Sequence, residues 1–113
     1  MLPRKRRLKK EFIEKVLKQG RFIAGRNISL KYFCIPGQAS AFGFVVSSKI
    51  AKSAVVRNKL KRRGRAIVSK FIPFIGEGNL ALVFFNEGGM KLKFKDLESE
   101  MAGLFKRAGI LLK

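Results

Sequence analysis

The chain has no histidine, no tryptophan and one cysteine among its 113 residues, and only 7 acidic side chains against 26 lysines and arginines. Without histidine it lacks the usual base of nucleophilic catalysis, and with one cysteine it lacks the usual zinc ligands. Its acidic residues are scattered, and the closest group, Asp96, Glu98 and Glu100, opens a predicted helix, where negative charge is ordinarily favourable. We therefore expect no catalysis and no metal site from this chain's own side chains.

Long hydrophobic runs are also missing. No segment approaches the roughly 20 apolar residues that span a membrane, and the basic start is not followed by the apolar stretch of a secretory signal. These features predict a cytoplasmic protein that does not bind membranes. Cys34, in an apolar run and without a second cysteine to pair with, is predicted to be a buried structural thiol.

What is present is an apolar core in a very basic chain. Hydrophobic residues make up 47% of the sequence, with 11 phenylalanines, so the net charge of +19 does not imply disorder. The length fits one domain covering residues 1–113. Residues 1–8 are rich in charge and poor in apolar side chains, and we predict that they form a mobile basic arm.

Apolar periodicity and turn residues predict the elements. A first helix covers residues 9–19, and the last helix begins near Asp96. Strands are predicted at 27–35 and 41–47, joined through Pro36 and Gly37 as an antiparallel hairpin. Residues 79–85, NLALVFF, are apolar throughout and fit a buried central strand.

The segment 49–71 is the most distinctive part of the chain. It is predicted to be a helix from about residue 54 to residue 71, with Ser53 as its N-cap. Its apolar residues recur at helical spacing and form a stripe of Val56, Leu60, Gly64, Ile67 and Phe71. The rest of the helix is basic and contains no acidic residue, which favours an anionic partner such as RNA or DNA.

Residues 57–65 have the sequence RNKLKRRGR, and residues 43–49 before them have the sequence GFVVSSK. Together they resemble the arginine-asparagine-arginine signature of the protein subunit of bacterial ribonuclease P, the endoribonuclease (a hydrolase) that removes the 5′ leader from precursor tRNA. The resemblance extends over nearly the whole chain, from the first helix ending at Gly20, through Arg26, to Leu104, Phe105, Lys106 and Arg107.

The resemblance implies a fold and a division of labour. The fold is a single-domain α+β sandwich with a mostly antiparallel four-stranded sheet and three helices, in the order α-β-β-β-α-β-α, with an unusual left-handed βαβ crossover. The partners are the catalytic RNA subunit and the 5′ leader of precursor tRNA. The chemistry belongs to that RNA and its Mg²⁺, and the protein holds no cofactor through dedicated ligands.

The resemblance also implies two surfaces on the protein. The residues expected to bind RNA are Lys49, Lys52, Arg57, Asn58, Lys59, Lys61, Arg62, Arg63 and Arg65. The residues expected to form a cleft for the single-stranded leader are Ile13, Leu17, Ser29, Lys31, Phe33, Val45 and Ser47.

This sequence departs from the family pattern at several of these positions. Ile13 and Leu17 stand where relatives have aromatic residues, so stacking of bases would be weaker there. Lys31 also stands where an aromatic residue is common, and at this position a phosphate contact is expected in place of stacking. Gly64 stands where a bulky aliphatic residue is usual, and close packing of the helix is the preferred explanation.

Two other functions share parts of this pattern. A ribosomal protein or general RNA chaperone would have the same composition, but mere basicity would not require the ordered signature from Gly43 to Arg65. A DNA-binding helix-turn-helix module would need a short helix before the basic one, whereas the preceding residues are predicted to be a strand. We therefore favour the RNA-binding subunit and expect no DNA partner.

Overall fold

The computed structural model describes residues 2–111, and the predicted order of helices and strands is confirmed. The elements are α1 (Lys10–Gln19), β1 (Arg21–Ala24), β2 (Ile28–Cys34), β3 (Ala41–Val45), α2 (Ala54–Phe71), β4 (Asn79–Phe85) and α3 (Phe94–Arg107). Three short 3-10 turns accompany them: η1 (Arg4–Arg6), η2 (Ile72–Phe74) and η3 (Glu87–Met90).

The sheet has the strand order β1-β2-β4-β3. β4 is antiparallel to β2 on one side and parallel to β3 on the other. The prediction of an antiparallel hairpin between β2 and β3 is therefore wrong, because β4 lies between them. The physical reason is the apolar character of β4, whose residues Leu80 to Val83 are at most 1% exposed, so that this strand needs a neighbour along each edge.

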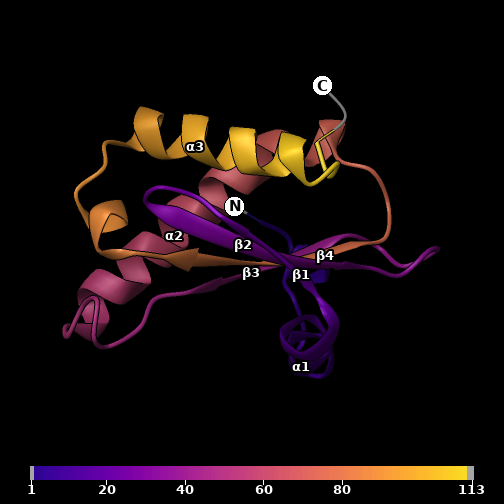
Figure 1. The fold of residues 1–113 in the computed structure, drawn as a ribbon, viewed down its shortest axis with the longest axis horizontal. Coiled ribbons are helices and arrows are strands. Elements are labelled where there is room, and N and C mark those ends of the chain that lie inside the picture. The colour runs from indigo at the N-terminus through magenta and orange to yellow at the C-terminus, as the bar shows by residue number, and fades with distance from the viewer. Residues whose placement is uncertain (1, 112–113) are drawn as a thin grey trace.

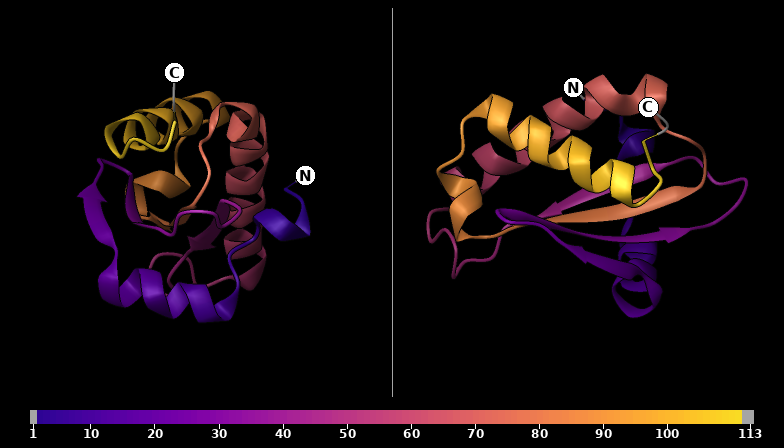
Figure 2. Two further views of the ribbon diagram at one scale, coloured as in Figure 1. Left: turned by 90° about the vertical axis from the view of Figure 1, so that its right-hand side faces the viewer. Right: turned by 45° about the horizontal axis from the view of Figure 1, so that its top comes forward.

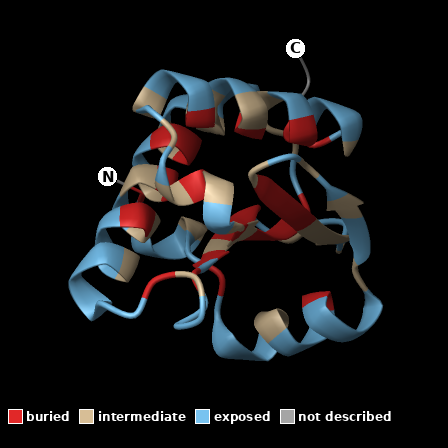
Figure 3. Ribbon diagram, turned by 60° about the vertical axis from the view of Figure 1, so that its left-hand side comes forward, coloured by how far each residue is buried: buried red, intermediate tan, exposed pale blue. Residues whose placement is uncertain are grey.

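The helices enclose the sheet on three sides. α3 lies over one face, α1 lies over the opposite face, and α2 runs along the edge formed by β3 (Figures 1 and 2). β1 forms the other edge, so β1 and α2 are on opposite sides of the molecule. In Figure 3 the buried residues gather in the sheet and on the inner sides of the helices.

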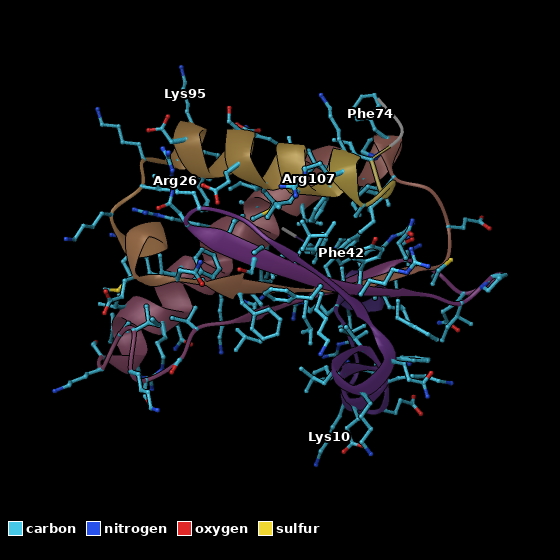
Figure 4. The ribbon with its side chains drawn as sticks, in the orientation of Figure 1. Lys10, Arg26, Phe42, Phe74, Lys95 and Arg107 are labelled. Atoms are coloured by element: carbon cyan, nitrogen blue, oxygen red, sulfur yellow. The ribbon has the colours of Figure 1, made fainter. Side chains whose placement is uncertain are left out.

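Two groups of buried side chains fill the layers. The larger group lies between the sheet and helices α2 and α3 and includes Phe42 (Figure 4). The ring of Phe42 stacks on that of Phe105 with centroids 5.6 Å apart. The smaller group lies beneath α1 and includes Val16, Leu80 and Leu82. Only one face of α1 is covered, because Val16 is its one buried residue.

The N-terminal residues differ from the predicted mobile arm. Leu2 is 1% exposed and belongs to the larger core, and Leu8 is 9% exposed. Arg7 forms a β-bridge with Phe42, and the amide of Leu8 donates to the carbonyl of Phe42 at 3.0 Å. Residues 2–8 therefore lie along the outer edge of β3, while Met1 is outside the described residues.

Two further predictions need correction. Cys34 is exposed because burial along β2 falls off toward the end of the strand, where Cys34 is the last residue. In α2 the buried residues are Leu60, Gly64, Ile67 and Val68, whereas Val56 is 37% exposed in the first turn. The N-cap is confirmed, since Ser53 Oγ accepts from the amide of Val56 at 3.4 Å. Within residues 2–111 no helix is both long enough and apolar enough to cross a membrane.

Candidate RNA interface

The basic residues of α2 divide into two groups by burial. Arg57, Lys61 and Arg65 recur every fourth residue, so they share one side of the helix, and all three are half-buried. Asn58, Lys59 and Arg62 are exposed to solvent, and Arg63 is half-buried. α2 thus presents cations both toward its neighbours and toward solvent.

Arg57 also ties the preceding loop to α2. Its Nη1 donates to the carbonyl oxygens of Ala51 at 2.8 Å and of Lys52 at 2.9 Å. The same loop carries Lys49 and Ser47, whose hydroxyl accepts from the amide of Lys49 at 3.1 Å. Arg57 therefore fixes the part of the loop nearest α2, and its remaining guanidinium nitrogens stay available for a phosphate.

The cations from Lys49 to Arg65 lack acidic partners. Across residues 2–111 the one ion pair within 4.0 Å joins Lys70 to Glu98 at 3.4 Å, beyond the C-terminal end of the basic run. Like charges gathered on a rigid helix repel one another unless an anion faces them. This surface is therefore electrostatically suited to a polyanion.

A second surface is the sheet face on the side of α1, which we call the cleft face. Strand register places two rows of side chains on this face. One row is Ala24, Ser29, Phe84 and Val45, and the other is Phe22, Lys31, Leu82 and Gly43. α1 packs over the next row, where Leu80 and Phe33 lie, and also over Leu82, which is 1% exposed, so the helix forms a wall on this face.

The wall is fixed to the cleft face by Lys31. Its Nζ donates a hydrogen bond to the carbonyl oxygen of Leu17, in the last turn of α1. This carbonyl is among those that a helix leaves without an intrahelical partner, and a cation is favourable at this end of a helix. Lys31 was expected to contact a phosphate, but its contact in the structure is with α1.

The two surfaces meet in a hollow of about 210 Å³, which we call the junction hollow. Ile13 of α1 and Val45 of β3 line it from the cleft face, and Lys61 and Arg65 line it from α2. Residues assigned from the sequence to two separate roles therefore share one concave site. Arg7 lines the hollow as well, and an apolar surface next to three cations is suited to unpaired bases followed by phosphates.

Not every predicted cleft residue is accessible. Leu17 is 44% exposed, Val45 is 36% exposed and Ser47 is exposed, whereas Ser29 is only 7% exposed. Phe33 packs partly buried against the core beneath α1. The accessible cleft thus consists of the α1 wall, Val45, Ser47 and the half-buried side chain of Lys31.

Sequence reasoning missed three residues on these surfaces. Arg7 lines the junction hollow but was assigned to a mobile arm. Phe84 lies on the cleft face between Ser29 and Val45, and the continuous apolar run of β4 hid which of its side chains face the cleft. Phe22, on the edge strand β1, is 60% exposed on the same face. The short β1 has too few residues to show an alternating pattern, so only its place after Gly20 could have pointed to it.

Metal-binding groups are not a feature of either surface. In the described part of the chain, no three side chains of histidine, cysteine, aspartate or glutamate come together as possible metal ligands. The chemical groups that these surfaces offer are cations, neutral polar side chains such as Asn58 and Ser47, backbone carbonyls and apolar side chains.

Comparisons with known proteins show which family this chain resembles. The model of the family described as Ribonuclease P matches residues 2–109. The Ribonuclease P protein component of Microcystis aeruginosa is 35% identical over 86 residues, covering 74% of this chain and 71% of the relative. That of Pseudanabaena sp. is 31% identical over 113 residues, covering 98% of this chain and 97% of the relative.

The fold has counterparts among solved structures. The RNase P protein of Staphylococcus aureus superposes with a TM-score of 0.83 at 20% sequence identity, covering 94% of this chain and 97% of that protein. At this identity the likeness concerns the fold, and the family assignment depends on the sequence matches. This chain belongs to the ribonuclease P protein family.

Proposed function

We propose that this chain is the RNA-binding protein subunit of ribonuclease P, and that it assists a catalytic RNA in removing the 5′ leader from precursor tRNA. The observation that carries the proposal is the junction hollow, where the cations of α2 adjoin the apolar cleft face. Such a site can bind the single-stranded leader while the rest of α2 contacts the catalytic RNA. Because precursor tRNA is the proposed substrate, we also propose that the protein is cytoplasmic.

In this proposal α2 and the loop before it dock on the catalytic RNA. Exposed Arg62 and Asn58 reach phosphate and sugar groups, and Arg57 holds the loop that carries Lys49 and Lys52. Guanidinium groups can bind two phosphate oxygens at once, which suits them to this role. Neutralising phosphates also lets two polyanions approach each other.

The leader lies in the cleft between the α1 wall and the accessible part of the cleft face. Ile13 and Leu17 offer apolar contact to bases, and Lys61 and Arg65 meet the backbone where the strand enters the junction hollow. Hydrolysis itself, with its Mg²⁺, belongs to the partner RNA. The protein supplies binding and alignment, and it contributes no catalytic side chain.

The predicted alternatives are less well supported. A ribosomal protein or RNA chaperone accounts for the charge but not for membership of this family. A helix-turn-helix module is disfavoured because the element before α2 is the strand β3 rather than a short helix.

The test is reconstitution with a cognate catalytic RNA at low Mg²⁺, scored for leader removal and for binding of precursor and mature tRNA. Ile13→Asp or Leu17→Asp should weaken precursor binding far more than mature tRNA binding, because only the precursor has a leader. Ser99→Asp, at an exposed position of α3, is the control with the same charge change and should affect neither. No stimulation by the wild-type protein, or equal losses on both tRNAs, would refute the proposal.

A further inference from the structure

Phe22 is an aromatic side chain that the fold leaves open. It is 60% exposed, whereas most phenylalanines of the described chain are buried or half-buried. In register it lies opposite Lys31, whose side chain reaches α1, so both side chains are on the cleft face. β1 is an edge strand, so Phe22 has no neighbouring strand on its outer side.

Phe22 and the junction hollow lie at opposite ends of one row of residues. The row runs Phe22, Lys31, Leu82 and Gly43, and the last two residues line the hollow. Three strand spacings of about 4.8 Å separate its ends, or roughly 14 Å in all. That span accommodates a few nucleotides, since a stacked strand advances about 3.4 Å per nucleotide.

The surroundings of Phe22 suit a nucleic acid strand. Lys18 and Arg21, both exposed, precede Phe22 in sequence, and within residues 2–111 no acidic side chain lies within 4.0 Å of either cation. Leu17, in the last turns of α1, is 44% exposed and adds apolar surface to the wall. An exposed ring among cations fits base stacking with neighbouring phosphate contacts, which is how proteins commonly bind single strands.

Phe22 also supplies the aromatic ring that the other accessible cleft residues lack. Ile13, Leu17 and Lys31 supply no ring, and Phe33 is partly buried beneath α1. We propose that Phe22 is the stacking platform of the cleft, binding one unpaired base of the leader at the end remote from α2. This inference rests on the proposed function, because it takes the leader as the strand in the cleft.

The experiment uses the complex reconstituted with catalytic RNA and precursor tRNAs that carry 2-aminopurine at single leader positions. Stacking on Phe22 should change the emission at one position. Phe22→Ala should abolish that change and weaken precursor binding by roughly 5- to 140-fold, the range of one stacked base. Phe22→Tyr should retain the signal and the affinity, whereas Phe22→Leu, apolar but without a ring, should not.

Two controls complete the design. Phe74→Ala removes another exposed ring, 51% exposed and on the opposite side of the sheet from α1 (Figure 4), and should leave binding unchanged. A leader cut too short to reach β1 should bind wild type and Phe22→Ala equally. If wild type prefers precursor over mature tRNA and Phe22→Ala keeps that preference and the emission change, the stacking platform alone is refuted. If the wild-type protein shows no preference for precursor over mature tRNA, both the stacking platform and the proposed binding of the leader are refuted.

Discussion

Gly64 of α2 lies directly against the ring of Phe44 on β3. A Cβ added to residue 64 would sit 2.6 Å from two carbons of that ring, closer than carbon atoms approach without displacement. Both residues are buried, with Phe44 9% exposed. The glycine therefore allows the aromatic ring to occupy space on the helix surface, and this contact sets how closely α2 packs on β3.

Gly64→Ala should destabilise the protein. Removing glycine from a helix interior contributes up to about 1 kcal/mol, but forcing a methyl group into a packed core costs about 1–3 kcal/mol. We expect a net loss of roughly 1–2 kcal/mol in the free energy of unfolding, measured by urea denaturation. Adding Phe44→Leu should recover part of that loss, since the two side chains compete for one space.

Gly103→Ala is the matched control. Gly103 is exposed within α3, and a Cβ there would meet nothing within 4 Å. The same substitution should therefore stabilise the protein by about 0.5–1 kcal/mol through helix propensity alone. If both variants were stabilised, the close contact with Phe44 would not govern position 64.

Arg57→Ala should lower both stability and RNA affinity. Its guanidinium donates to two loop carbonyls, so its removal should cost about 1–2 kcal/mol in unfolding free energy and loosen the loop that carries Lys49 and Lys52. Affinity for the catalytic RNA should fall and the logarithmic slope of affinity against salt should shrink by about one or more, as measured in a salt titration.

Arg62→Ala separates these two effects. Arg62 is exposed on α2 and has no hydrogen-bond or ion-pair partner among the described residues. Its loss should reduce the salt slope by about one unit while the urea midpoint stays unchanged. If Arg57→Ala matched Arg62→Ala in both measurements, the positioning of the loop by Arg57 would be excluded.

The helices were predictable because their signals are local. Ser53 caps α2 as expected, and the apolar stripe through Leu60, Gly64 and Ile67 is buried. Strand pairing was not predictable in the same way, because neighbours in sequence need not be neighbours in a sheet. The apolar run of β4 correctly indicated a central strand, and a central strand requires two partners, yet nothing in 27–47 shows that β2 and β3 are those partners.

The candidate site was predicted in part for a related reason. The resemblance gave the positions on α2 and α1, and the structure brings Ile13, Val45, Lys61 and Arg65 to one hollow. Arg7 was not predicted to belong to the site, because the charge of residues 1–8 suggested a mobile segment. In the structure Leu2 and Leu8 are buried, and they anchor this segment. Long-range burial of two leucines cannot be read from their sequence neighbours.

Glu100 anchors the turn between β1 and β2, and with it the edge strand that carries Phe22. Its carboxylate accepts from the amides of Asn27 at 2.7 Å and Ile28 at 3.0 Å, and from Asn27 Nδ2 at 2.8 Å. Glu100→Ala leaves these donors without their partner in a half-buried turn. We expect a loss of about 2–4 kcal/mol in unfolding free energy, because unpaired donors cost about 1–3 kcal/mol each.

Glu98→Ala is the control on the same helix, with the same change in charge. The carboxylate of Glu98 pairs with Lys70, whose side chain is 59% exposed, and such surface pairs contribute about 0–1 kcal/mol. Urea denaturation should therefore show a large loss for Glu100→Ala and a small change for Glu98→Ala. Hydrogen exchange should also speed up at residues 21–28 in the Glu100 variant alone, since β1 pairs only with β2. Equal stability of the two variants would mean that the turn is held by the sheet rather than by α3.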